Sequence, residues 1–144
     1  MSSGGGKKRM SGDRKRVIAE KIAAALAGKD DVCFAYIFGS FASKDGFKDI
    51  DVGIFISDEN IASHLSLELE LERELEDAVR MPVDVRIINN APLSFVYNVL
   101  RQKFVIVDKD KTWRADFEGL VYKKYFDFKY LRDEYLREII NAPF

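Results

Sequence analysis

The sequence predicts an α/β (α+β) domain in which a small mixed sheet of about four strands packs with helices. Three observations support this fold class. Apolar strand-like runs alternate with segments of helical periodicity, in the order helix, strand, strand, helix, strand, helix, strand, helix. The 144 residues are enough for one domain with a real core. Hydrophobic residues make up 47% and charged residues 33%, which is the balance of a globular protein.

The N-terminal segment, residues 1–12, is expected to lie outside this domain. It is rich in Ser, Gly, Lys and Arg, a composition typical of a flexible arm, so a single domain is expected over residues 13–144. A helix should begin near Asp13, because the apolar residues that follow it recur at helical spacing. Gly28 is well placed to end that helix.

Four segments have the pattern of strands. Residues 32–38 form an unbroken apolar and aromatic run, which is typical of a strand covered on both faces. Residues 49–56 alternate between apolar side chains and a second set that begins with two carboxylates, which indicates a strand with one apolar face. Further strands are expected at residues 83–88 and 104–107.

Three helices are expected between and after these strands. Residues 58–80 show some strand-like alternation, but the abundance of Leu and Glu and the length of the segment favour a helix. A second helix should cover residues 91–102, with Pro92 in its first turn. A third should cover residues 112–141, and its first apolar residues are expected in the core: Trp113, Phe117, Leu120 and Val121. Its later aromatic residues exceed what one helical face can bury, which indicates a partner surface or a dimer seam.

Three carboxylates stand out in the strands. Asp49 and Asp51 are two residues apart, so they share one strand face with Cα atoms about 6.5–7 Å apart. Asp84 lies between Val83 and Val85 in the next strand, again opposite an apolar face. If the two strands are neighbours, the three carboxylates converge and repel one another unless a divalent cation such as Mg²⁺ binds them. The alternative is an ordinary solvated strand face.

Gly39 and Ser40 come directly after the first strand. Glycine lets the backbone approach a ligand closely, and a serine at a helix start can bind an anion with its hydroxyl group and nearby N–H groups. Alone, this pair is an ordinary turn. Next to a carboxylate pair on the following strand, it indicates a site for a phosphate and a metal ion.

This combination resembles the DNA polymerase beta-like nucleotidyltransferase superfamily. The resemblance rests on Gly39-Ser40, Asp49-Ile50-Asp51-Val52 and Val83-Asp84-Val85, and it extends over residues 17–135. The branch it is most similar to is the minimal nucleotidyltransferases, or MNT domains, which often pair with HEPN proteins in toxin–antitoxin operons. Three departures lie in the loop from Ser40 to Asp49. It is shorter than in many relatives, it ends in Lys48 where relatives often have Ser, and it has Ser43 followed by Lys44 where relatives often have a basic residue near the position of Ser43.

The resemblance implies a polymerase-beta-like fold and nucleotidyl transfer. Asp49 and Asp51 would hold two Mg²⁺ ions, and Asp84 would complete one of them and accept the proton of the acceptor hydroxyl group. Gly39 and Ser40 would bind the β- and γ-phosphates of ATP. The expected enzyme is a protein adenylyltransferase that moves AMP to a hydroxyl group on a HEPN-type toxin and so acts as its antitoxin.

Two other functions stay open at this point. The chain could be a non-catalytic antitoxin that binds and masks its partner, or a small-molecule adenylyltransferase of the aminoglycoside type. A formal net charge of −1 weighs against nucleic acid as a partner, and no apolar run is long enough to cross a membrane. With one cysteine and no signal-peptide pattern, the cytoplasm is the expected location, and a homo-oligomer stays open.

Overall fold

The computed structural model describes residues 8–9, 12–43, 46–47, 49–58 and 63–141. The elements in chain order are β1 (Lys8–Arg9), α1 (Gly12–Ala27), β2 (Val32–Phe38), α2 (Ser40–Ser43), β3 (Gly46–Phe47), β4 (Ile50–Ile56), α3 (His64–Val79), β5 (Val83–Ile87), α4 (Leu93–Arg101), β6 (Phe104–Asp108) and α5 (Lys111–Asn141). The predicted order of helices and long strands is confirmed.

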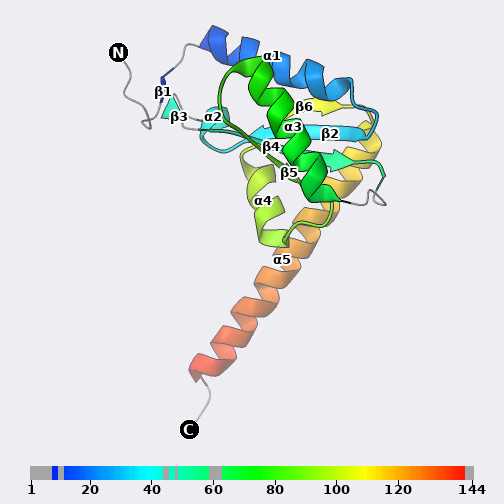
Figure 1. Cartoon of the computed structure of the whole chain (residues 1–144). Helices are drawn as coiled ribbons and strands as arrows, with labels where there is room; N and C mark the ends of the chain where they lie inside the picture. Colours follow the sequence, from blue (N-terminus) through cyan, green and yellow to red (C-terminus); the bar gives the residue numbers. More distant parts are fainter. Residues whose placement is uncertain (1–7, 10–11, 44–45, 48, 59–62, 142–144) are drawn as a thin grey trace.

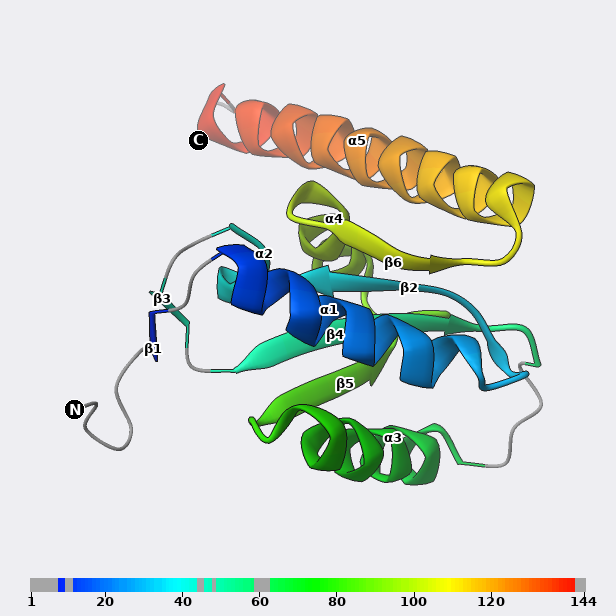
Figure 2. The ribbon, with the colours of Figure 1, turned by 90° about the horizontal axis from the view of Figure 1, so that it is seen from above.

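The four longer strands form one mixed sheet in the order β5-β4-β2-β6. β2 is antiparallel to both of its neighbours, whereas β4 and β5 are parallel. Figure 1 and Figure 2 show this sheet with helices on both sides. A small mixed sheet of four strands packed with helices is the architecture that the sequence predicts.

Each face of the sheet has its own core. Ile50, Val52 and Ile54 of β4 are fully buried against α1 and α3. On the opposite face, Phe55 is buried in a second cluster under α4 and the first part of α5. The face of β4 that begins with carboxylates is therefore solvated only at its start, because α4 and α5 cover it further along the strand.

β5 is an edge strand of the sheet, and α3 covers its outer side. Three glutamate side chains of α3 accept hydrogen bonds from the backbone N–H groups of β5: Glu76 from Val83 at 3.0 Å, Glu72 from Val85 at 2.8 Å and Glu68 from Ile87 at 2.8 Å. Four residues of a helix span about 6.0 Å and two residues of a strand about 6.6 Å. Every fourth residue of α3 can therefore meet every second N–H group of β5. These bonds satisfy N–H groups that an edge strand would otherwise present to another strand.

The N-terminal segment differs from the expectation at two places. Lys8–Arg9, placed by the sequence in a flexible arm, pairs antiparallel with Gly46–Phe47, and α1 already begins at Gly12. Two-residue strands are too short to produce an alternation of apolar and polar residues in the sequence. For this reason their pairing could not be predicted from the sequence. The remainder of the predicted arm lies outside the described residues.

Two other helices begin later than expected. The helix predicted from residue 58 begins at His64, where the Ser63 side chain accepts a hydrogen bond from the N–H group of Ser66 at 3.1 Å. Such an N-cap stops a helix from extending backwards because it satisfies the first free N–H groups. Pro92 is the N-cap residue of α4 and lies just before its first turn.

The last helix, α5, lies on the sheet with its first part and extends beyond it with the rest (Figure 1). Val121 is buried as expected, and Phe117 packs partly buried against the second core cluster. The core assignment was wrong for Leu120, which is 49% exposed, and Trp113 is 40% exposed although its ring contacts Phe55. One face of a helix lies on the sheet, and Leu120 is about 100° around the helix from Val121.

A hydrogen-bonded ion cluster fastens α5 to the sheet. Glu118 accepts hydrogen bonds from the Tyr36 hydroxyl group and the Lys103 ammonium group, both at 2.6 Å, and from Arg114 at 3.0 Å. Burial alone would raise the pKa of Glu118, but these three donors outweigh it and the pKa lies below its ordinary value. None of the helices in the described ranges is both long and apolar enough to span a membrane.

Candidate functional site

Two parallel strands place two of the predicted carboxylates side by side. Asp51 of β4 pairs in register with Asp84 of β5, so both side chains leave the same face of the sheet from backbones about 5 Å apart. Asp49 directly precedes β4 and is exposed. Asp84 is exposed as well, whereas Asp51 is partly buried. The structure thus brings Asp51 and Asp84 together on one face where β4 and β5 begin, and Asp49 lies close enough for its charge to act on Asp51.

The acidic surroundings change the protonation of Asp51. Burial raises the pKa of this carboxyl group most, and the nearby carboxylates of Asp84 and Asp49 raise it further. Arg86 acts in the opposite direction, and the pKa lies at about 6 where 3.8 is ordinary. The raised pKa means that the protein disfavours the charged form of Asp51, as expected for a carboxylate whose charge is stabilised by a bound cation.

The end of β2 meets this cluster through Gly39. Phe38 pairs with Asp51 across the sheet, so Gly39 and Ser40 follow directly beside the carboxylates. Gly39 has a φ of +77°, and a Cβ atom added there would lie 2.5 Å from the Oδ2 atom of Asp51. Only glycine fits this conformation and this approach. Ser40 then begins the short helix α2, as the sequence indicates.

The donor set fits a hard divalent cation. Its side chains supply only carboxylate oxygens, which Mg²⁺ prefers, and the glycine leaves room beside the most buried of them. In the ranges that the structure describes, no three His, Cys, Asp or Glu side chains lie close enough together to ligate one ion. Because Asp49 and Asp84 are exposed, a change of rotamer that draws them toward Asp51 costs little once a cation offsets their repulsion.

Two charged residues of the site were not identified from the sequence. Glu72 of α3 shares a hydrogen bond with Asp84. Burial raises the pKa of Glu72 most, and the hydrogen bond with Asp84 raises it further, whereas the hydrogen bond from the Val85 N–H group lowers it. Arg86 lies two residues after Asp84 on the same face of β5, and its positive charge lowers the pKa of Asp51. The alternation of side chains within β5 could have placed Arg86 on the face of Asp84. Glu72 could not be found in this way, because it reaches Asp84 only through the packing of α3 on β5.

Residues 20–112 match the family described as Polymerase beta, Nucleotidyltransferase. No curated protein sequence matches the chain significantly.

Several solved structures share the fold. One is a tri-AMPylated Shewanella oneidensis HEPN toxin in complex with MNT antitoxin, with a TM-score of 0.68 and 18% identity over 88% of this chain and 98% of that chain. A toxin–antitoxin structure with AMP-PNP gives a TM-score of 0.63 and 19% identity over 90% and 99%. The toxin–antitoxin MntA-HepT gives 0.62 and 15% over the same shares. At these identities, the likeness concerns the fold.

Proposed function

Because the chain belongs to the polymerase beta nucleotidyltransferase family, we propose that it transfers AMP from ATP to a hydroxyl group of a HEPN-type protein partner and acts as the antitoxin of that pair. The observation that carries the proposal is the pairing of Asp51 with Asp84 beside Gly39, where burial and, after it, the crowded carboxylates raise the pKa of Asp51 to about 6. Structures with this fold include a complex with an AMPylated HEPN toxin and one with AMP-PNP.

Each residue of the site has a role in this reaction. Asp49 and Asp51 would hold two Mg²⁺ ions, and Asp84 would hold one of them; the ions, when bound, neutralise charge on the α-phosphate and on the leaving pyrophosphate. Gly39 lets the backbone approach the β- and γ-phosphates, and the Ser40 hydroxyl group donates a hydrogen bond to them. With ATP as its substrate, the enzyme would work in the cytoplasm.

The chemical step forms one bond and breaks one. The acceptor hydroxyl oxygen attacks the α-phosphorus, the bond from that phosphorus to the bridging oxygen breaks, and pyrophosphate leaves in line with the attack. Asp84 takes the hydroxyl proton. Its exposed position at the edge strand suits this role, because an acceptor on another protein can reach it from solvent.

The partner would dock on the part of α5 that extends beyond the sheet. The helical stripe that buries Val121 continues with Phe128, Tyr135 and Ile139, whose side chains are 56%, 62% and 48% exposed. No other described element covers this stripe (Figure 1). A continuous apolar helical face of this length favours a protein partner over a small-molecule acceptor.

The reaction is tested by incubating the protein with its HEPN-type partner, Mg²⁺ and ATP and measuring the intact mass of the partner. We expect a gain of one or more AMP groups, and no gain with Asp84→Ala. The exposed carboxylate of Asp116 on α5 supplies the control, since Asp116→Asn should leave the gain unchanged. A partner that binds tightly but gains no mass with the intact enzyme would show that the masking antitoxin, which the exposed stripe of α5 also suits, is the correct function.

The docking surface is tested with two exposed tyrosines of α5. Tyr135 lies on the apolar stripe, whereas Tyr130 is about 140° away around the helix, and they are 62% and 64% exposed. Tyr135→Asp should weaken the partner's affinity at least about tenfold, and Tyr130→Asp should change it little. Equal effects of the two substitutions on the dissociation constant would exclude the stripe as the docking surface.

A further inference from the structure

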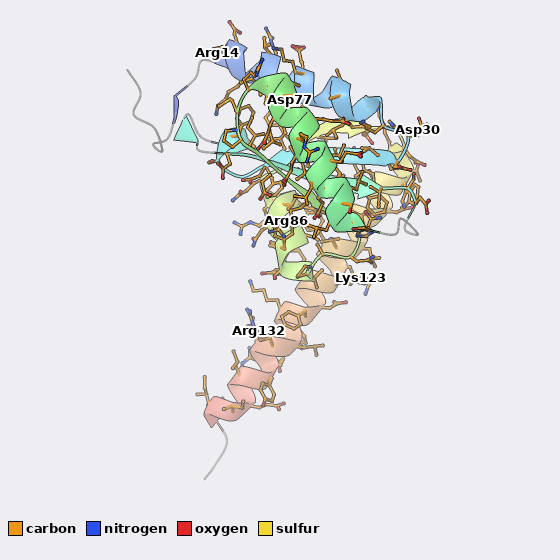
Figure 3. The ribbon with its side chains drawn as sticks, in the orientation of Figure 1. Arg14, Asp30, Asp77, Arg86, Lys123 and Arg132 are labelled. Carbon is orange, nitrogen blue, oxygen red and sulfur yellow. The ribbon has the colours of Figure 1, made fainter. Side chains whose placement is uncertain are left out.

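Arg86 shares the sheet face that carries the paired carboxylates. In the parallel register of β4 and β5, Asp84 pairs with Asp51 and Arg86 with Gly53, so all four residues lie on one face. Arg86 is exposed, and within the described ranges no carboxylate forms an ion pair with it. Figure 3 shows its side chain beside α4. The residue is therefore a cation without an acidic partner next to an acidic cluster.

Aromatic rings hold the guanidinium group at this place. The Arg86 guanidinium carbon lies 5.7 Å from the centroid of the Phe95 ring on α4. Phe95 in turn packs edge-on against Phe38 at 5.9 Å, and Phe38 directly precedes Gly39. A cation–π contact orients a guanidinium group without using its N–H donors. The donors of Arg86 thus remain available to a ligand beside the carboxylates.

The field of Arg86 reaches the centre of the site. Its positive charge lowers the pKa of Asp51, whereas burial and the carboxylates of Asp84 and Asp49 raise it. A nucleoside triphosphate bound there would add several more negative charges to a cluster that is already acidic. Arg86 belongs to β5, the strand that carries Asp84, whereas Gly39 follows β2 on the other side of β4. In the proposed reaction the acceptor approaches Asp84, so Arg86 is on the strand nearer to the acceptor and Gly39 is nearer to the β- and γ-phosphates.

We propose that Arg86 is a catalytic residue that, in the transition state of AMP transfer, donates hydrogen bonds to the oxygens of the α-phosphate and stabilises their negative charge. This inference rests on the proposed function. As the acceptor oxygen bonds to the α-phosphorus, the proton passes to Asp84 and pyrophosphate leaves, while Arg86 keeps its proton and faces the oxygens of the transferred group. Because the Phe95 ring already orients the guanidinium group, less reorganisation is needed when negative charge develops on the transferred group.

The test separates binding from chemistry. The dissociation constant of AMP-PNP with Mg²⁺ and the single-turnover rate of AMP transfer to the HEPN-type partner are measured for the wild type, Arg86→Gln and Arg86→Lys. We expect Arg86→Gln to lower the rate about 10²–10³-fold with a change in affinity of less than about threefold, because the interaction forms in the transition state. Arg86→Lys should recover part of the rate, because it restores the charge without the planar donors.

A second stacked arginine provides the matched control. Arg101, also exposed, lies 5.9 Å from the Tyr97 ring on α4, and it is not among the charges that shift the pKa of Asp51. Arg101→Gln should keep the rate, and the unliganded melting temperatures of all variants should agree, because both arginines are on the surface.

Two outcomes would overturn the inference on Arg86 alone. One is a rate for Arg86→Gln within about threefold of the wild type. The other is a loss of AMP-PNP affinity at an unchanged rate, which would make the Arg86–Phe95 pair a ground-state binding surface, for instance for the nucleobase. If the wild type itself neither binds AMP-PNP with Mg²⁺ nor transfers AMP, the proposed function fails, and the role of Arg86 fails with it.

Discussion

Replacing Asp51 by Asn should make the protein more stable and inactive at the same time. The pKa of Asp51 rises from 3.8 to about 6 on folding, so the charged form is disfavoured in the native state. One pH unit corresponds to about 1.4 kcal/mol, which gives about 3 kcal/mol for a fully buried group. Asp51 is only partly buried, and solvent screening reduces this to about 1–2 kcal/mol. The amide of Asn removes the charge and keeps the shape.

The sign of the pH dependence follows from the same shift. Between about pH 4 and pH 6 the native Asp51 binds a proton that the unfolded chain has released, so its contribution to stability falls as the pH rises through this window. Above that window the loss is complete. The difference in free energy of unfolding between Asp51→Asn and the wild type should therefore be small near pH 4 and reach about 1–2 kcal/mol at pH 7.

Urea unfolding at a series of pH values measures this difference, with Asp116→Asn as the control for a solvent-exposed carboxylate. At pH 7, Mg²⁺ with AMP-PNP should stabilise the wild type and not Asp51→Asn, because only the wild type retains the carboxylate that would bind the ion. The reasoning is refuted if Asp51→Asn is no more stable than the wild type at pH 7, or if the difference between the two does not depend on pH.

Three further substitutions test other parts of the structure. Gly39→Ala should lower the free energy of unfolding by about 1–3 kcal/mol, because its φ is positive and its new Cβ atom meets Asp51; thermal unfolding and the AMP-PNP shift measure both effects. Glu72→Ala should cost about 1–3 kcal/mol and promote aggregation, since the Val85 N–H group of the edge strand loses its acceptor; Glu72→Gln, which keeps an acceptor oxygen, should behave like the wild type in urea unfolding and light scattering. Glu118→Ala should cost about 3–5 kcal/mol, because it leaves the Lys103 ammonium group and the Tyr36 hydroxyl group unpaired under α5, while Arg114 keeps its ion pair with Asp108; a loss below about 1 kcal/mol in urea unfolding would show that the ion cluster does not fasten this helix.

The sequence by itself determined the order of the helices and long strands and named the candidate residues of the site. The apolar run at residues 32–38 coincides with β2, and the alternation after Asp49 with β4, because a strand buried on one or both faces leaves a local pattern of apolar residues. Carboxylates two residues apart share a face wherever the chain is extended through both, so Asp49 and Asp51 could be named together, although Asp49 lies just before β4. Gly39 was also recognisable, since a close backbone approach requires glycine.

The tertiary structure alone decided which of these elements meet. Pairing of Asp51 with Asp84 depends on β4 and β5 being adjacent and parallel, and that depends on how α3 crosses between them. The pKa of Asp51, the hydrogen bond that Glu72 accepts from the edge strand and the place of Arg86 depend on the same packing. Periodicity describes neighbours along the chain, whereas burial, register and electrostatic fields arise between residues that are distant in it. For this reason the sequence named the carboxylates, and only the fold placed a cation beside them.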